Sequence, residues 1–181
     1  MTTTAATTVQ LPSGTWTIDA SHTEVGFVAR HLMVSKVRGT FREVSGTVEV
    51  AEDVTQSSVE VAAQIASVET GSPDRDTHLK SADFFDAEQF PAMTFRSTSF
   101  DGATLAGDLT IKDVTKPVTF DVEFGGVGQD PWGNTKAGFE ATTTVNRKDW
   151  GLTWNAAVEG GGVLVSDKIT ITIDVQLAKQ A

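Results

Sequence analysis

Most of this chain alternates between apolar and polar residues, the pattern of β-strands that bury one face. The alternation is strictest at 118–124 and at 169–177, where every second residue is apolar. Neighbouring side chains of a strand point to opposite faces, so these runs predict half-buried strands. Shorter runs predict further strands at 15–19, 25–29, 59–65, 93–100, 103–112 and 139–145.

Two stretches depart from this pattern. Within 36–50 the apolar spacing slips between Phe41 and Val44, which predicts a bulge or bend at that point. The stretch 125–134 is rich in glycine and contains Asp130 and Pro131, so we expect a flexible loop there.

One segment, 74–86, indicates a helix instead of a strand. Ser72 is a capping residue, Pro73 suits the first helical position, and Asp74 places an acid in the first turn. We therefore predict a short helix near residues 73–81. Phe84 and Phe85 follow it, and we expect them to turn inward so that the segment plugs one end of the fold.

The predicted elements favour an all-β fold. About eight strands joined mostly by short turns pair antiparallel and close naturally into an up-and-down barrel. A two-sheet sandwich is the alternative architecture. With 181 residues the chain suits one domain. We expect residues 13–178 to form a single β-barrel domain and residues 1–12 to form a disordered N-terminal tail.

Composition narrows the classes of function. The formal net charge of −10 repels phosphate backbones, so we expect no nucleic-acid partner. No apolar run approaches the roughly 18 residues of a membrane helix, so the chain is not expected to span a membrane. Cysteine is absent, which excludes disulfides and thiolate sites within this sequence. The first ten residues lack the basic and apolar regions of a secretory signal, so we expect a cytoplasmic protein.

The apolar face of such a barrel can line a tunnel for an apolar ligand. Alternation alone does not distinguish a hollow barrel from a filled one, so each residue can equally be packed core. The candidate ligand-binding residues are Val25, Phe27, Phe41, Val48, Ile65, Phe84, Phe85, Met93, Phe95, Leu109 and Phe120.

A group of cations stands out in this acidic chain. Arg30, Arg38 and Arg42, with Lys36 among them, occur close together in the sequence. Arginine suits phosphate recognition, so the three arginines are candidates for contact with a ligand's head group. The alternative is that they are solvated residues on exposed strand faces.

The remaining polar residues give little sign of catalysis. His22, His31 and His78 come from distant segments without the spacing of a metal-binding helix, so we predict no metal site and no cofactor. Acid pairs such as Asp74 with Asp76 are typical of a solvated helix surface. An enzyme would need a buried, hydrogen-bonded set around His22, His78 and an aspartate. We therefore predict no catalytic residues and a protein that is not an enzyme.

Several motifs in order resemble the YceI-like, polyisoprenoid-binding family. The similarity covers about 13–177. Its last motif is RKDWGL at 147–152, with Trp150 where phenylalanine is more usual. The other matching motifs are DASHTEVGF at 19–27, GTF at 39–41, DTHLKSADFFD at 76–86, FPAMTF at 90–95 and GDLTIKDVTKPV at 107–118.

The resemblance implies an extended, lipocalin-like, eight-stranded antiparallel barrel whose tunnel holds one isoprenoid-type amphiphile. It also makes a homodimer plausible. Many members carry a secretion signal, and this chain departs from them there. The sequence as a whole predicts a protein that binds or carries an isoprenoid-tailed lipid, such as a polyprenyl phosphate or a quinone. The alternatives are an enzyme acting on such a lipid and a filled barrel with a structural or interaction role.

Overall fold

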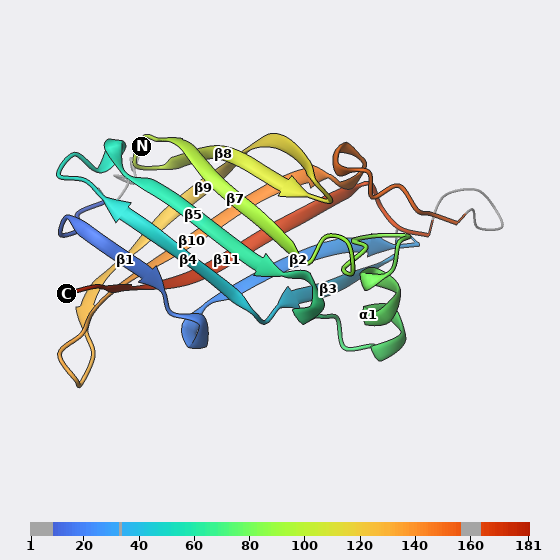
Figure 1. Cartoon of the computed structure of the whole chain (residues 1–181), viewed down its shortest axis with the longest axis horizontal. Coiled ribbons are helices and arrows are strands. Elements are labelled where there is room, and N and C mark those ends of the chain that lie inside the picture. The colour runs from blue at the N-terminus through green and yellow to red at the C-terminus, as the bar shows by residue number, and fades with distance from the viewer. Residues whose placement is uncertain (1–8, 33, 157–163) are drawn as a thin grey trace, which may run out of the picture.

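The computed structural model describes residues 9–32, 34–156 and 164–181 (Figure 1). In this part of the chain, eleven strands form one antiparallel sheet. Because apolar residues occupy alternate positions, each long strand turns one apolar face to the inside. The strands are β1 Gly14–Ile18, β2 Glu24–His31, β3 Ser35–Phe41, β4 Val44–Val50, β5 Ser58–Gln64, β6 Val68–Glu69, β7 Ala92–Phe100, β8 Thr104–Ile111, β9 Val114–Gln129, β10 Thr135–Asn146 and β11 Lys168–Lys179.

The sheet closes through β11, which pairs with β2 near its start and with β1 near its end. In the same way β3 pairs with β2 and β4 pairs with β1. β6 and β5 continue this arrangement against β3 and β4. Three wall strands are thus each broken into two halves. With each broken pair counted once, the fold is a closed eight-stranded antiparallel barrel, which confirms the predicted fold class.

The breaks occur where the hydrophobic pattern slips. The chain leaves β3 at Phe41 and enters β4 at Val44, which confirms the predicted bend. Between β1 and β2 a 3-10 turn, Ala20–His22, interrupts the wall, and Asp19 caps it by accepting a hydrogen bond from the Ser21 backbone N–H. Further 3-10 turns are Val54–Gln56, Ile65–Ser67 and Arg147–Trp150.

The predicted loop at 125–134 is wrong for its first half. β9 runs through Gln129 and pairs with β10, so only 130–134 form the hairpin turn. The register passes from Phe124↔Phe139 to Gly126↔Gly138, which leaves Gly125 as the extra residue of a bulge. Gly126 has a φ of 120°, a conformation that favours glycine. The glycines therefore mark a bulge within a strand and not its end.

The single helix of the described residues is α1, Pro73–Lys80, as predicted. Ser72 caps it, with the Arg75 backbone N–H donating to Ser72 Oγ. Asp76 ties the helix to the preceding chain, because its carboxylate accepts a hydrogen bond from the Thr70 backbone N–H at 2.8 Å. Figure 1 shows α1 at one end of the barrel, with the C-terminus at the opposite end, and α1 contacts β6.

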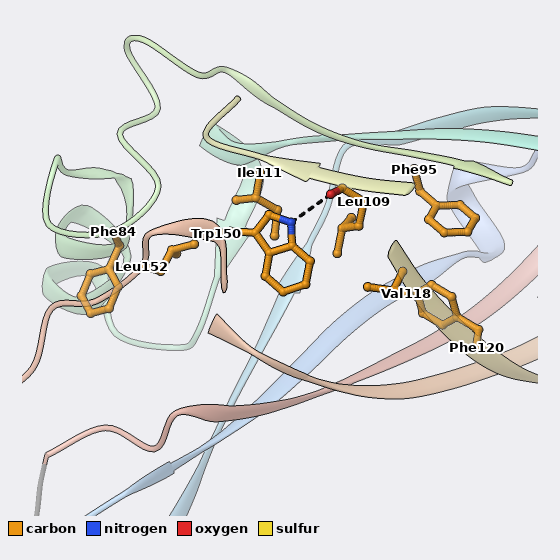
Figure 2. Close-up of a cluster of buried hydrophobic side chains, with 8 residues drawn as sticks. All are labelled: Phe84, Phe95, Leu109, Ile111, Val118, Phe120, Trp150 and Leu152. Atoms are coloured by element: carbon orange, nitrogen blue, oxygen red, sulfur yellow. Dashed lines mark hydrogen bonds between the residues drawn. The ribbon is translucent and has the colours of Figure 1, made fainter. Parts of the chain in front are cut away.

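Three groups of buried side chains fill the walls. The largest contains Phe95, Phe120 and Trp150 (Figure 2), and Trp150 Nε1–H donates to the Leu109 carbonyl at 2.9 Å. A second surrounds Phe41, near α1. The third surrounds Trp16, near the C-terminus of the chain.

The predicted tail, residues 1–12, falls mainly on residues 1–8, which lie outside the described residues. Residues 9–12 are described, and they lie on the barrel. Val9 is 6% exposed, and Leu11 packs against the Trp16 group. The described residues contain no helix long and apolar enough to cross a membrane.

Candidate ligand-binding interior

The barrel contains a cavity of about 170 Å³ at the end where the chain terminates, which we call the terminal cavity. Val9 and Leu11 border it, together with inward-facing residues of β4, β5 and β7 to β11. Its polar lining consists of Thr23, Ser57 and Thr94, and no ionisable side chain belongs to the described lining. Such a surface favours an apolar occupant, because few polar groups lose their hydration.

A second cavity of about 270 Å³ lies at the α1 end, which we call the helix cavity. Its aromatic lining comes from Phe27, Phe41, Phe84, Phe85, Trp150 and Trp154. Unlike the terminal cavity it has ionisable lining residues, and among the described residues these are all basic. They are Arg30, His31, Arg75, His78 and Arg147, with no Asp or Glu.

The two cavities adjoin one another. Val25, Met93 and Ile171 line both, from β2, β7 and β11. The interior therefore changes along the barrel from a mostly apolar lining without ionisable groups at the terminal end to an aromatic and basic lining at the helix end. This gradient matches an elongated molecule with an apolar tail and a polar head.

Ten of the eleven residues predicted from the sequence border these cavities. Ile65 does not: it is 1% exposed and packs in the Phe41 group. Because β5 ends at Gln64 and Ile65 begins a 3-10 turn, strand alternation no longer determines the direction of its side chain. The residues of the terminal cavity are Val25, Val48, Met93, Phe95, Leu109 and Phe120, and those of the helix cavity are Val25, Phe27, Phe41, Phe84, Phe85 and Met93.

Phe84 and Phe85 turn toward the interior, as the sequence predicts. The rings of Phe41 and Phe85 meet edge to face with centroids 5.9 Å apart. The Phe84 ring lies 5.4 Å from Trp154. The segment after α1 thus closes part of the barrel end with aromatic side chains, and we call 81–86 the plug.

His78 fastens α1 to the plug. Its Nε2 lies 2.8 Å from Asp83 Oδ2, and its ring packs against Trp154 and Phe84 with centroids 4.6 and 5.0 Å away. The edge-to-face contact with Trp154 joins the helix to the chain that follows β10. These contacts make His78 a structural residue at the cavity rim.

Arg147 is buried and holds the chain around the helix cavity. Its guanidinium donates to the carbonyls of Leu152 at 2.6 Å, Trp154 at 2.9 Å and Ser166 at 2.9 Å. Burial lowers the pKa of Arg147, with the Asp167 carboxylate opposing the shift, and an arginine still remains charged at neutral pH. Because its donors are occupied by carbonyls, this side chain supports the site and leaves ligand contact to others.

The three head-group candidates occupy different places. Arg30 lines the helix cavity. Arg38 is exposed on β3 and lies outside both described linings. Arg42 is also outside them, and its Nε donates to Glu69 at 2.8 Å on the surface.

Sequence reasoning missed several residues of the helix cavity. Arg75, His78 and Trp154 were not predicted to line it, and neither was Ile171 of β11. The alternating isoleucines at 169–173 carried a usable signal for β11. Arg75 and Trp154 carried none, because a helix and a loop bring them to the barrel end.

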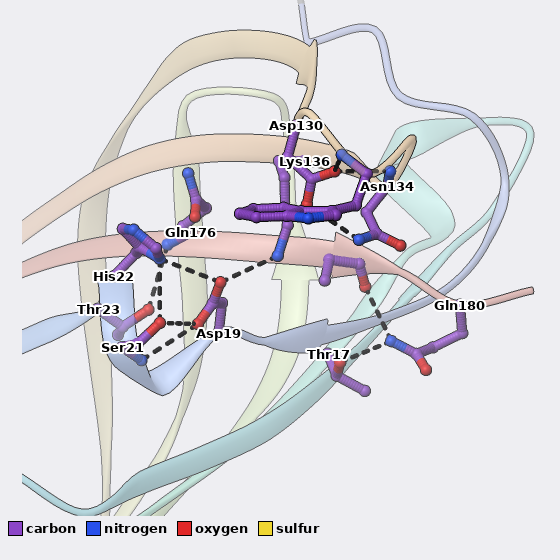
Figure 3. A network of polar contacts seen from close by, with 12 residues as sticks. Thr17, Asp19, Ser21, His22, Thr23, Asp130, Asn134, Lys136, Gln176 and Gln180 are labelled. Atoms are coloured by element: carbon purple, nitrogen blue, oxygen red, sulfur yellow. Dashed lines mark hydrogen bonds and ion pairs between the residues drawn. The ribbon is translucent and has the colours of Figure 1, made fainter.

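At the break between β1 and β2 a serine, a histidine and an aspartate lie close together (Figure 3). His22 Nδ1 lies 3.0 Å from Ser21 Oγ and 3.2 Å from Asp19 Oδ2, while Ser21 Oγ donates to Asp19 Oδ1 at 2.6 Å. Both contacts use the same ring nitrogen of His22, whereas a catalytic triad uses one nitrogen for each partner. The hydrogen bond from Ser21, followed by that from Lys136, lowers the pKa of Asp19. The group therefore braces the break between β1 and β2.

The described residues contain no group of three or more His, Cys, Asp or Glu side chains that could hold a metal ion. His22 and His78 belong to separate hydrogen-bonded groups, with Asp19 and Asp83 respectively. The joint set that an enzyme would need around these two histidines does not form.

The closed barrel and its apolar interior define a lipocalin-like class of fold. A family model for the YceI-like domain matches residues 16–177. The chain belongs to the YceI-like family.

Relatives and solved structures agree with this assignment. The UPF0312 protein SAS2572 of Staphylococcus aureus is 40% identical over 158 residues, which are 85% of this chain and 91% of the relative. The YceI protein of Campylobacter jejuni has a TM-score of 0.70 and 30% identity, with 96% of this chain and 100% of that chain covered. A polyisoprenoid binding domain from Saccharophagus degradans has a TM-score of 0.71 over 91% of this chain and 98% of its own. It is 12% identical, so it supports the fold alone.

Proposed function

We propose that this protein binds one isoprenoid-tailed amphiphile, with the tail in the terminal cavity and the head in the helix cavity. The observation that carries the proposal is the gradient of the interior, from a lining without ionisable groups to an aromatic and basic one. The name of the Saccharophagus degradans domain, a polyisoprenoid binding domain of the same fold, supports the choice of tail.

The interior has room for a few isoprene units of the tail, and a longer tail extends beyond the two cavities. A dry apolar cavity of roughly 150 Å³ accommodates a benzene molecule. The cavities here are about 170 and 270 Å³, and they share lining residues. A tail that buries roughly 300 Å² at about 25 cal/mol per Å² gains on the order of 7 kcal/mol, before the costs of immobilisation. That gain is enough for a carrier that must also release its ligand.

An acidic head, such as that of a polyprenyl phosphate, fits the helix cavity better than a neutral quinone. Arg30 and His31 line it from β2, and its described lining contains no carboxylate to repel an anion. Arg75 donates to the Thr70 side chain and carbonyl, and Arg147 to three carbonyls. We therefore propose Arg30 as the main contact of the head group.

We propose a binding function and not an enzymatic one. The support is the geometry around the two histidines, because His22 and His78 each complete a separate local structural contact. The cytoplasmic location and the homodimer stay predictions.

Filling the terminal cavity tests the proposal. Ala141 lines this cavity, whereas the next residue, Thr142, is exposed on the other face of β10. We expect Ala141→Phe to weaken binding of decaprenyl phosphate by about tenfold or more, because the ring occupies the space of the tail. The measurement is a titration of delipidated protein with the lipid in detergent, scored by native mass spectrometry.

Thr142→Phe is the matched control, and it should bind like the original protein. Urea unfolding of both variants checks that the barrel is intact. Equal affinity of folded Ala141→Phe and Thr142→Phe proteins would show that the tail does not enter the terminal cavity.

A further inference from the structure

The tip of the β2–β3 hairpin exposes apolar side chains at the helix end of the barrel. Val34 is 82% exposed and Leu32 is 41% exposed. The same hairpin contributes Arg30, His31 and Val37 to the helix cavity. Figure 1 shows the far ends of β2 and β3 on the same side of the molecule as α1. The exposed tip therefore adjoins the mouth of the proposed head-group site.

The β2–β3 hairpin is also a basic segment in an acidic protein. The chain has a formal net charge of −10, yet between Glu24 and Glu43 it contains no acidic residue. Arg30 and Lys36 lie opposite each other across the hairpin, and Arg38 follows on β3. All three are exposed. Cations thus flank the apolar tip on both strands.

We propose that this tip docks on an anionic lipid surface and so presents the helix cavity to a membrane. Exposed apolar residues bordered by Lys and Arg are the pattern of segments that lie in the membrane interface. Each cation near an anionic leaflet adds attraction, while the apolar side chains enter the region below the head groups. The inference rests on the proposed function for its purpose, since a membrane is where an isoprenoid-tailed lipid resides.

Neither a partner protein nor a second copy fits the tip as well. A specific protein interface buries roughly 1,000 Å² or more, and the apolar side chains described at the tip, Leu32 and Val34, offer far less. A symmetric contact between two tips would bring the cations of one hairpin against those of the other. A lipid surface needs no matching shape and supplies the opposite charge.

Exposed acidic side chains at the helix end of the barrel determine which part of the protein faces the lipid surface. Asp74 and Asp83 are exposed on α1 and on the plug. An anionic surface repels them, and at 0.15 M salt this repulsion extends about 8 Å. The hairpin therefore makes the contact while α1 stays farther from the surface.

Vesicle flotation of the full-length protein tests the inference. One set of vesicles contains phosphatidylserine and phosphatidylcholine in a 3:7 ratio, and the other contains phosphatidylcholine alone. We expect the protein to float with the anionic vesicles. Leu32→Asn with Val34→Ser should reduce binding about tenfold, because the apolar anchor is lost. Asparagine suits position 32, where Leu32 has a φ of 55°.

One further double variant tests the role of the cations, and a variant at the other end of the barrel is the control. Lys36→Gln with Arg38→Gln should reduce binding to the anionic vesicles about tenfold or more. Trp132→Ser should leave it unchanged, because Trp132 is 83% exposed in the β9–β10 turn at the other end of the barrel. Equal flotation of the Leu32/Val34 variant and the original protein would overturn the proposal.

Two further measurements separate the explanations. If the Leu32/Val34 variant loses a dimer in size-exclusion chromatography with light scattering and still floats, the tip binds a second copy and the lipid proposal is wrong. Native mass spectrometry measures binding of decaprenyl phosphate independently. If flotation depends on the hairpin but the protein binds no such lipid, docking stands and the proposed function fails.

Discussion

Arg30 and Arg147 serve different purposes because their donors meet different partners. Arg147 is buried and gives its donors to the carbonyls of Leu152, Trp154 and Ser166. Arg30 is exposed at the end of β2 and borders the helix cavity. A buried arginine that is fully hydrogen-bonded fixes the chain, whereas an exposed one at a cavity rim can contact an anion.

At the scale of single residues, the prediction concerns the contact between Arg30 and the head group of the ligand. We expect the protein to bind decaprenyl phosphate more tightly than decaprenol, which has the same tail and no charge. Arg30→Gln should weaken the binding of decaprenyl phosphate about tenfold. It should leave the binding of decaprenol unchanged, because only the charged contact is lost. Isothermal titration of delipidated protein measures both.

Arg38→Gln is the matched control, since Arg38 is exposed on the neighbouring strand and lies outside both described linings. Its affinities should equal those of the original protein. Loss of phosphate affinity in Arg38→Gln but not in Arg30→Gln would contradict the placement of the head group.

At the scale of the elements, two glycines make room for phenylalanine rings on neighbouring strands. A Cβ at Gly39 would collide with the ring of Phe27, and one at Gly107 would collide with the ring of Phe95 and the Arg96 carbonyl. The rings thus pack directly on the backbone of the next strand. Each ring therefore covers a glycine, a strand position without a side chain.

Substitution of Gly107 tests that packing. We expect Gly107→Ala to lower the free energy of unfolding by about 1–3 kcal/mol, because the added methyl group displaces Phe95 or the strand itself. Gly138→Ala is the control: nothing lies within 4 Å of a Cβ there, so the change should stay within about 0.5 kcal/mol. Urea unfolding measures both, and a similar loss in the two variants would contradict the account.

Much of the element pattern could be predicted from the sequence. Alternation located the long strands, and Ser72 with Pro73 located α1. The wrong predictions fall at residues whose type occurs in two different local structures. Gly125 resembles a loop residue but forms a bulge, and Ile65 continues an alternation that its 3-10 turn has already ended.

At the scale of the whole molecule, the cavities depend on contacts between distant segments, which the alternation of apolar and polar residues does not reveal. An inward face was predictable for Phe95 and Phe120, but whether the space between opposite walls is filled depends on how the barrel closes. The basic lining of the helix cavity combines Arg30 of β2 with Arg75 of α1, which only the tertiary fold brings together. Family resemblance supplied the isoprenoid class of ligand, which the residues alone did not.

The central claim is that the interior holds an isoprenoid-tailed amphiphile. Native mass spectrometry of the protein purified from its own cells, without detergent, tests it most directly. The account predicts a second species, heavier than the 19.2 kDa chain by the mass of one lipid, which releases a polyprenyl phosphate on activation. A protein that appears only at the mass of the empty chain, and that stays empty after incubation with decaprenyl phosphate, would contradict it.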